Sequence, residues 1–308
     1  MNTVYTKLNF ITNRGCLKSV EKKICSDFIH LHKSYSEMIT FPHAKINIGL
    51  WITAKRPDGY HDIQTIFYPV GLCDALEFVL SPSGGKKDNL SVTGIALNGT
   101  AENLVIKALT IMRKKVHIPW LDIHLHKVIP PGAGLGGGSS DAAFFLKMLN
   151  KYFNAGLTDG ELKVMALEAG SDSPFFIDCV PAFAQGRGEK LTPLPPVSGR
   201  YHLIIVYPGI QISTREAYMS CCPEMRETML PVYYSEDISM WKNIIRNDFE
   251  CIIFAKYPYL KEVKELLYRA GALYSSMSGS GSAVYGIFHE KPVIREALLK
   301  NVVYSGPL

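Results

Sequence analysis

The chain has 308 residues, of which 47% are hydrophobic and 20% are charged, and this composition excludes a mostly disordered protein. The net charge is +5, of which residues 1–37 carry +3, from six Lys or Arg against three Asp or Glu. The remainder has no basic footprint for nucleic acid, and no apolar run approaches the roughly 20 residues of a membrane span. We therefore expect a globular protein of about two domains, with neither nucleic acid nor a membrane as partner.

The seven cysteines indicate a reduced compartment. Their number is odd, no Cys-x-x-Cys pair occurs and no secretory signal precedes them. Such usage favours neither a disulfide framework nor a zinc site. We therefore predict a cytoplasmic location and expect the cysteines to be small buried hydrophobic side chains.

Residues 1–37 differ from the rest of the chain. Their apolar residues are scattered without a sustained period, and they contain no apolar core of a signal peptide. An ordered pattern begins only at Met38. We interpret 1–37 as a dispensable N-terminal extension or as a start assigned too early, so a protein that begins at Met38 should fold and act normally.

Apolar periodicity then predicts strands and helices along the chain. A period of two over 45–52 indicates a strand, and Pro57-Asp58-Gly59 marks the turn that follows it. Further strand-like segments lie between 66 and 78, before a surface turn over 81–85. Helical spacing predicts one apolar helix face, made up of Val105, Ala108, Leu109 and Met112. A strand around 123–125 leads into two prolines and a cluster of glycines.

The second half also mixes helices and strands. Thr158 to Glu161 has the form of a capping box and begins a helix that Gly170 ends. The best linker candidate lies at 193–199. Beyond it we expect strands at 203–207, 283–288 and 302–305, and helices at 214–220, 240–255, 261–270 and 292–300. The sequence therefore predicts an α+β fold in two lobes.

The strongest local signal is a glycine loop between a strand and a helix. It reads Pro130, Pro131, Gly132, Ala133, Gly134, Leu135, Gly136, Gly137, Gly138, Ser139 and Ser140. Glycine allows positive φ and lets backbone N–H groups approach a ligand closely, and a helix N-terminus adds partial positive charge. The loop therefore predicts a phosphate site, with Ser139 or Ser140 capping the helix. The alternative is a tight loop with a structural role only.

Two other phosphate motifs fit this loop poorly. A Walker A motif needs Lys before Ser or Thr, and here Gly138 precedes Ser139. Gly132, Gly134 and Gly137 satisfy the dinucleotide pattern G-x-G-x-x-G, but that pattern expects an acidic residue at the end of a following strand. The next acidic residue outside the loop's own helix is Asp159, in a predicted helix cap, so an oxidoreductase is disfavoured.

Three polar residues suggest an acid–base site. Lys45 and Asn47 lie two residues apart on a strand, so they share one face, and an inward Lys-x-Asn pair needs an anionic partner. Asp172, in the turn after Gly170, is a candidate. The alternatives are a Lys45 stem lying along apolar surface and an Asp172 bonded to its own backbone. His124 and His126 share a strand face, which we interpret as solvated positions, and no metal ligand is assigned.

Five segments together carry a resemblance to a known family. They are Ala44–Leu50, Arg56–His61, Pro131–Ala143, Gly170–Phe176 and Met277–Ala283. In this order they resemble the GHMP kinases, which include galactokinase, homoserine kinase and mevalonate kinase. The resemblance implies an N-terminal ATP-binding domain over 38–197, similar to domain 2 of ribosomal protein S5. It also implies a ferredoxin-like C-terminal domain over 198–308.

The resemblance further implies the reaction and the site. ATP with Mg²⁺ would phosphorylate the 2-hydroxyl of a cytidine-diphospho sugar alcohol, a small-molecule substrate of non-mevalonate isoprenoid biosynthesis. Asp172 and Lys45 match catalytic residues, and the loop 130–140 matches the ATP site. Substrate-binding residues are matched by Asn47, Tyr60, His61 and Phe183, with Tyr60 and Phe183 stacking on the cytosine and His61 reading its edge. The loop 278–282 matches a third motif that packs against the active site.

Alternatives remain open at this point. Another GHMP kinase with a smaller alcohol substrate, of the homoserine or mevalonate type, shares the loop. A non-catalytic ligand-binding relative needs no base, so Lys45 and Asp172 together argue against it. Asp141 departs from the simplest match, because a carboxylate there would repel phosphate unless it faces away or helps to hold Mg²⁺; its role stays open.

Overall fold

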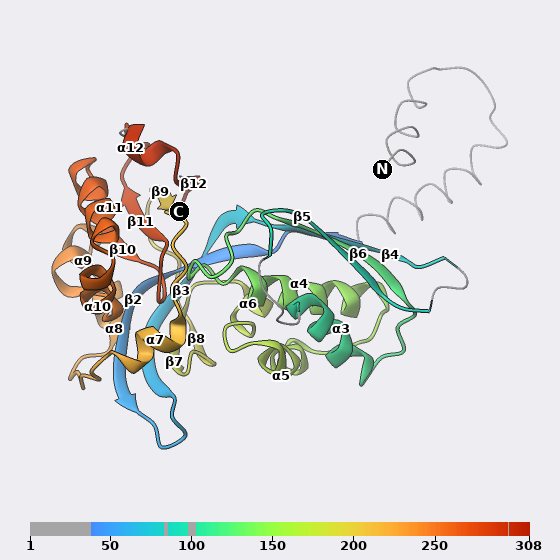
Figure 1. The fold of residues 1–308 in the computed structure, drawn as a ribbon. Helices are drawn as coiled ribbons and strands as arrows, with labels where there is room; N and C mark the ends of the chain where they lie inside the picture. The colour runs from blue at the N-terminus through green and yellow to red at the C-terminus, as the bar shows by residue number, and fades with distance from the viewer. Residues whose placement is uncertain (1–37, 83–85, 98–102, 295) are drawn as a thin grey trace. The chain divides into compact units, whose positions relative to one another are not determined.

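Three four-stranded sheets and the helices packed on them form the part of the chain that the structure describes (Figure 1). The computed structural model describes residues 38–82, 86–97, 103–294 and 296–308. The extension predicted over 1–37 and most of the turn predicted over 81–85 lie outside the described residues. Residues Ile39–Leu308 make up one unit.

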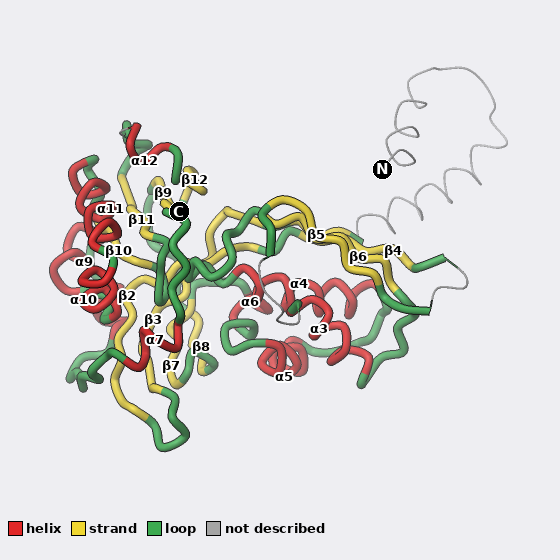
Figure 2. The backbone as a smooth tube through the Cα atoms, in the orientation of Figure 1, coloured by secondary structure: helices red, strands yellow, loops and turns green. Residues whose placement is uncertain are grey.

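The first sheet carries the helix that follows the glycine loop. Its strand order is β1 (Ile39–Thr40), β4 (Ala75–Leu80), β6 (Leu121–Lys127) and β5 (Asn89–Gly94), with β5 and β6 parallel. Helices α3 (Leu104–Arg113), α4 (Gly137–Tyr152) and α5 (Asp159–Ala169) lie on one side of it (Figure 2). All four residues of the predicted helix face are buried in α3, and the predicted capping box of α5 and its end at Gly170 are confirmed.

The second sheet is built on a long hairpin. Strands β2 (His43–Lys55) and β3 (His61–Cys73) pair antiparallel along their length, and β7 (Ala182–Gly186) and β8 (Lys190–Pro193) extend the sheet. A short helix, α6 (Phe175–Asp178), precedes β7. The predicted strand over 45–52 is therefore confirmed, whereas β7 and β8 were not predicted from the sequence.

The third sheet has the topology of a ferredoxin-like fold. Its order is β10 (Tyr274–Met277), β11 (Val284–Phe288), β9 (His202–Val206) and β12 (Val302–Pro307), with every neighbouring pair antiparallel. Between β9 and β10 lie helices α7 (Thr214–Met219), α8 (Leu230–Tyr234), α9 (Ile238–Ile244), α10 (Phe249–Lys256) and α11 (Pro258–Arg269), and α12 (Glu296–Leu299) lies between β11 and β12. This order is the β-α-β-β-α-β arrangement, so the expected ferredoxin-like lobe is confirmed.

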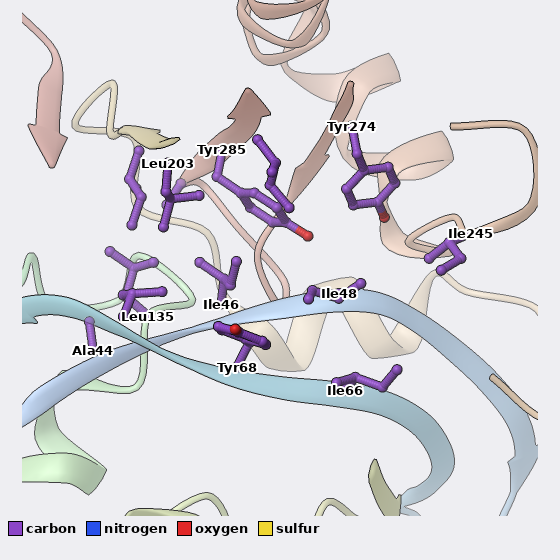
Figure 3. Close-up of a cluster of buried hydrophobic side chains, with 14 of the residues drawn as sticks. Ala44, Ile46, Ile48, Ile66, Tyr68, Leu135, Leu203, Ile245, Tyr274 and Tyr285 are labelled. Carbon is purple, nitrogen blue, oxygen red and sulfur yellow. The ribbon is translucent and has the colours of Figure 1, made fainter. Parts of the chain in front are cut away.

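A shared core joins the second and third sheets. Side chains of β2 and β3, such as Ile46 and Ile66, face Leu203, Tyr274 and Tyr285 from the other sheet (Figure 3). On its opposite face the third sheet packs against α10 and α11. This core contains residues from both predicted domains, 38–197 and 198–308. The packing therefore does not separate the two domains, and their boundary stays a prediction.

Two helix predictions are wrong. The segment 240–255 forms not one helix but α9 and α10, because Arg246 O accepts from the Leu50 N–H (3.1 Å) and Leu50 O accepts from the Asp248 N–H (2.8 Å). Because these backbone groups form a strand-like bridge with Leu50, residues 246–248 cannot continue the helix. The segment 292–300 is helical only over Glu296–Leu299.

The cysteine expectation is also wrong for the five cysteines that the structure describes. Cys73, Cys179 and Cys221 are half-buried, and Cys222 and Cys251 are exposed. None of the described helices is both long and apolar enough to cross a membrane.

Candidate active site

The glycine loop connects β6 to α4 and presents an uncapped helix N-terminus. Gly132, Gly134 and Gly136 all have positive φ, between 67° and 80°. Gly136 is the N-cap of α4, and no side chain caps the helix. The prediction that Ser139 or Ser140 is the cap is therefore wrong, because both lie inside the first turn. Uncapped N–H groups at a helix start suit a phosphate.

Backbone contacts fix this loop against the rest of the site. The Lys45 N–H donates to Leu135 O (3.0 Å) and the Ala283 N–H donates to Ala133 O (3.1 Å). Ser278 Oγ donates to Gly134 O at 2.8 Å. A Cβ on Gly134 would collide with the Ser278 carbonyl, so glycine is required there. The segment 277–283 therefore packs on the loop, as the resemblance implies.

Lys45, Asn47 and Asp172 come together beside the loop. Lys45 Nζ donates to Asn47 Oδ1 at 2.5 Å and lies 3.6 Å from Asp172 Oδ2. Lys45 is 3% exposed, whereas about a third of the Asp172 side chain is exposed. Burial lowers the pKa of Lys45, and the Asp172 carboxylate opposes this shift. The predicted Lys45–Asn47 face is confirmed, and the structure brings Asp172 to it.

The stem of Lys45 also touches the glycine loop. A Cβ on Gly136 would lie 3.1 Å from Lys45 Cγ and 2.8 Å from Phe176 Cζ. The ammonium itself lies over the Phe67 ring, 4.9 Å from its centroid. The Lys45–Asp172 ion pair and the candidate phosphate site are therefore neighbours.

A cavity of about 840 Å³ opens beside Asp172. Tyr60 and His61, which lie at the tip of the β2–β3 hairpin, line it, and so does Tyr218 of α7. The His61 and Tyr218 rings stack, with centroids 5.2 Å apart and 19° between planes. Arg187 covers the Tyr60 ring at 3.9 Å and donates to Ser171 Oγ at 3.1 Å. The cavity lining thus combines aromatic side chains with a carboxylate.

The cavity also carries a cationic excess. Its charged lining comprises three cations, Lys55, Arg187 and Arg215, and two anions, Asp58 and Asp172. Burial lowers the pKa of His61, with Lys55 adding to the shift. A phosphorylated ligand is compatible with such a lining.

The structure does not bring Phe183 to this cavity. Phe183 pairs with Ile66 in the β3–β7 register and is 4% exposed, inside the shared core. Side chains alternate along a strand, and Phe183 therefore faces away from Lys45 and Asn47. Tyr218, which sequence reasoning missed, is the aromatic residue placed beside His61.

Asp141 and the two strand histidines have partners elsewhere. Asp141 is 3% exposed and pairs with Lys127 at 2.8 Å. His124 contacts Glu77 (3.0 Å) and Thr93 (2.9 Å), and His126 contacts Thr93 (3.0 Å). Among the residues that the structure describes, no group of three or more His, Cys, Asp or Glu could hold a metal ion.

Comparisons with known proteins identify the family. The family model of the GHMP kinases N terminal domain matches residues 103–186, and that of the GHMP kinases C terminal domain matches residues 229–303. The 4-diphosphocytidyl-2-C-methyl-D-erythritol kinase of Bacteroides thetaiotaomicron is 47% identical, over 84% of this chain and 95% of that protein. The same kinase from Porphyromonas gingivalis is also 47% identical, over 86% and 97%.

Solved structures extend the comparison. A crystal structure of 4-(cytidine 5'-diphospho)-2C-methyl-D-erythritol kinase is 31% identical, with a TM-score of 0.69, and covers 88% of this chain and 98% of that one. Homoserine kinase from Cytophaga hutchinsonii shares the fold at 17% identity and a TM-score of 0.59, covering 88% and 93%. The chain therefore belongs to the 4-diphosphocytidyl-2-C-methyl-D-erythritol kinases, within the GHMP kinase family.

Proposed function

We propose that this protein transfers a phosphoryl group from ATP to the 2-hydroxyl of 4-diphosphocytidyl-2-C-methyl-D-erythritol. The products are the 2-phosphate and ADP, and the step belongs to non-mevalonate isoprenoid biosynthesis in the cytoplasm. The observation that carries the proposal is the Lys45–Asp172 pair at 3.6 Å, which lies between the glycine loop and the cavity. A protein that only binds its ligand needs no base, so a buried ammonium beside a carboxylate at the cavity favours a kinase.

The glycine loop is the proposed ATP site. Residues 130–140 would hold the phosphates through backbone N–H groups, which the positive-φ glycines and the uncapped start of α4 leave available. The Ser140 and Ser173 hydroxyls nearby are buried without a hydrogen-bond partner, so the loop region still has unused polar groups. Mg²⁺, bound with the phosphates of ATP, would supply neutralising charge.

Asp172 and Lys45 would handle the proton of the substrate. Asp172 would accept it from the attacking hydroxyl, because its carboxylate is partly exposed to the cavity. Lys45 would orient that carboxylate through their ion pair. Asn47, fixed by Lys45 and by a 2.9 Å bond from its Nδ2 to Thr65 Oγ1, would position the sugar alcohol.

The cavity would bind the cytidine diphosphate. Tyr60 and Tyr218 would stack on the cytosine and His61 would read its edge, with Tyr218 in place of the expected Phe183. Arg187, which contacts both Tyr60 and Ser171, would bind the diphosphate. A volume of about 840 Å³ falls within the range of small-molecule sites, roughly 300–1,000 Å³.

The test is ADP release coupled to NADH oxidation, with Mg-ATP and the cytidyl substrate. Homoserine, mevalonate, galactose and free methylerythritol serve as parallel alcohols. We expect turnover on the cytidyl substrate alone. Equal turnover on free methylerythritol, or turnover only on another alcohol, would reject the assignment of the cavity to cytidine diphosphate.

A further inference from the structure

A buried charged cluster lies behind the glycine loop. It consists of Asp74 between β3 and β4, Lys127 at the end of β6 and Asp141 in α4, which are 1%, 3% and 3% exposed. Lys127 Nζ donates to Asp74 Oδ2 and, at 2.8 Å, to Asp141 Oδ2. Burying charged side chains is costly even when they are paired, so the cluster calls for an explanation beyond stability.

The cluster is tied to both ends of the loop. Asp74 Oδ1 accepts from the N–H groups of Val128 (2.6 Å) and Ile129 (2.9 Å), which lead into the loop. Asp141 lies in the helix at its exit. Lys127 therefore connects the entry and the exit of the loop through two carboxylates.

The ammonium also lies directly beside the start of α4. A Cβ on Gly137 would lie 3.2 Å from Lys127 Nζ and 2.9 Å from Ile129 Cγ2. Gly137 is the first residue of the helix whose free N–H groups face the candidate phosphate site. A shift of Lys127 would therefore be transmitted to those groups.

We propose that Asp74, Lys127 and Asp141 form a clamp that fixes the ends of the glycine loop in the geometry that binds ATP, so that they are positioning residues. The proposal rests on the proposed function, because it takes the loop as the ATP site. Glycine-rich backbone loses much conformational entropy when it is ordered. A loop held before ATP arrives does not incur that loss on binding.

Two variants of Asp141 distinguish the effect of its hydrogen bond to Lys127 from the effect of its negative charge. Asp141→Asn keeps an oxygen that accepts from Lys127, and Asp141→Ala removes it. Both leave the same balanced pair of Lys127 and Asp74, so both should fold. We expect Asp141→Ala to raise the Kd for a fluorescent ATP analogue about tenfold, with the KM for the cytidyl substrate unchanged. Asp141→Asn should stay within about twofold of the wild type.

Amide hydrogen exchange tests the same clamp without nucleotide. In Asp141→Ala, the amides of residues 128, 129 and 132–138 should exchange about tenfold faster than in Asp141→Asn. Lys147→Met is the matched control, because Lys147 lies on the same helix and donates to Ile177 O (2.7 Å), away from the loop. It should change neither the exchange nor the Kd. If Asp141→Ala does not fold, Asp141→Ser replaces it.

The outcomes are distinct. Wild-type affinity or wild-type exchange in Asp141→Ala would overturn the clamp, as would equal losses in the Asn and Ala variants. A wild-type protein that does not bind the ATP analogue would reject the ATP site itself. The exchange experiment would then still decide whether the clamp orders the loop.

Discussion

The Lys45 ammonium lies 3.6 Å from the Asp172 carboxylate although one is almost fully buried and the other is a third exposed. Lys45 comes from β2, and Asp172 from the turn between α5 and α6. The pair therefore depends on the second sheet packing against the helical layer. This arrangement places a carboxylate at the cavity wall and keeps its partner cation out of water.

Replacing Asp172 should abolish turnover but not nucleotide binding. Asp172→Asn keeps the shape of the side chain and removes the base, so kcat should fall by about 10²–10⁴-fold. The Kd for an ATP analogue should stay within about twofold, because none of the hydrogen bonds and ion pairs described for residues 130–140 involves the Asp172 side chain. Asp178→Asn is the control, since Asp178 pairs with Lys163 at 2.6 Å outside the cavity. Wild-type kcat in Asp172→Asn would remove Asp172 from the mechanism.

Replacing Lys45 should separate activity from stability. Burial lowers the pKa of Lys45, so the buried positive charge lowers the free energy of unfolding. Lys45→Met should lower kcat about 100-fold or more without lowering Tm.

The same shift fixes the sign of a pH dependence. The Lys45 amine has a pKa of 10.5 in the unfolded chain and a lower pKa in the folded chain. Between these two values the unfolded chain therefore binds more protons than the folded chain. Wild-type stability relative to Lys45→Met should therefore rise as the pH rises toward that value. Urea unfolding at several pH values measures it. A Lys45→Met protein that is active, or strongly destabilised at every pH, would contradict this account.

The two candidate aromatics should respond in opposite ways. Tyr218→Leu should raise the KM for the cytidyl substrate by roughly 5- to 150-fold, since stacking on a base contributes about 1–3 kcal/mol. Phe183→Leu, in the shared core, should lower the free energy of unfolding by about 1 kcal/mol and leave KM unchanged. Steady-state kinetics and urea unfolding on both proteins measure this. A raised KM in Phe183→Leu alone would restore the expectation from the sequence.

Period-two spacing explains why part of the site could be predicted. Lys45 and Asn47 share a strand face whatever the partner strand is, and the glycine loop is recognised by composition alone. Local patterns of this kind depend only on neighbours in the chain. The positive-φ glycines of the loop and the apolar face of α3 could be predicted for the same reason.

The parts that could not be predicted depend on register or on distant contacts. Phe183 faces the core because it pairs with Ile66 on β3, and no pattern within its own strand shows this. Tyr218 meets His61 only through the packing of α7 against the hairpin tip. The break between α9 and α10 likewise follows from a bridge to Leu50. In each case the deciding contact lies far away in the sequence.

Arg187 should act on the diphosphate and not on the base. Its guanidinium is fixed by the Tyr60 ring and by Ser171, and charge-assisted hydrogen bonds contribute about 1.5–3 kcal/mol. Arg187→Gln should raise the Ki of cytidine diphosphate about tenfold and leave that of cytidine unchanged. Lys190→Gln, the same charge change at an exposed position of β8, is the control. An equal loss for cytidine would show that Arg187 supports the base instead.

Asp141 should make stability depend on pH near neutrality. Burial raises its pKa to about 7, Lys127 opposes this and Asp74 adds to it. The folded state therefore binds the proton more tightly than the unfolded chain, whose pKa is 3.8. The stability that this group contributes is complete below pH 3.8 and is lost as the pH rises through about 7.

Asp141→Asn cannot ionise, so its stability relative to the wild type should increase from pH 5 to pH 8. Urea unfolding across that range measures the difference. Asp122→Asn is the control: hydrogen bonds from Asn89 and Ser81 lower the pKa of Asp122, so this carboxylate is ionised throughout the range and the difference should stay flat. A flat profile for Asp141→Asn as well would mean that Asp141 is ionised at pH 5, with the buried cluster carrying a net negative charge beneath the glycine loop.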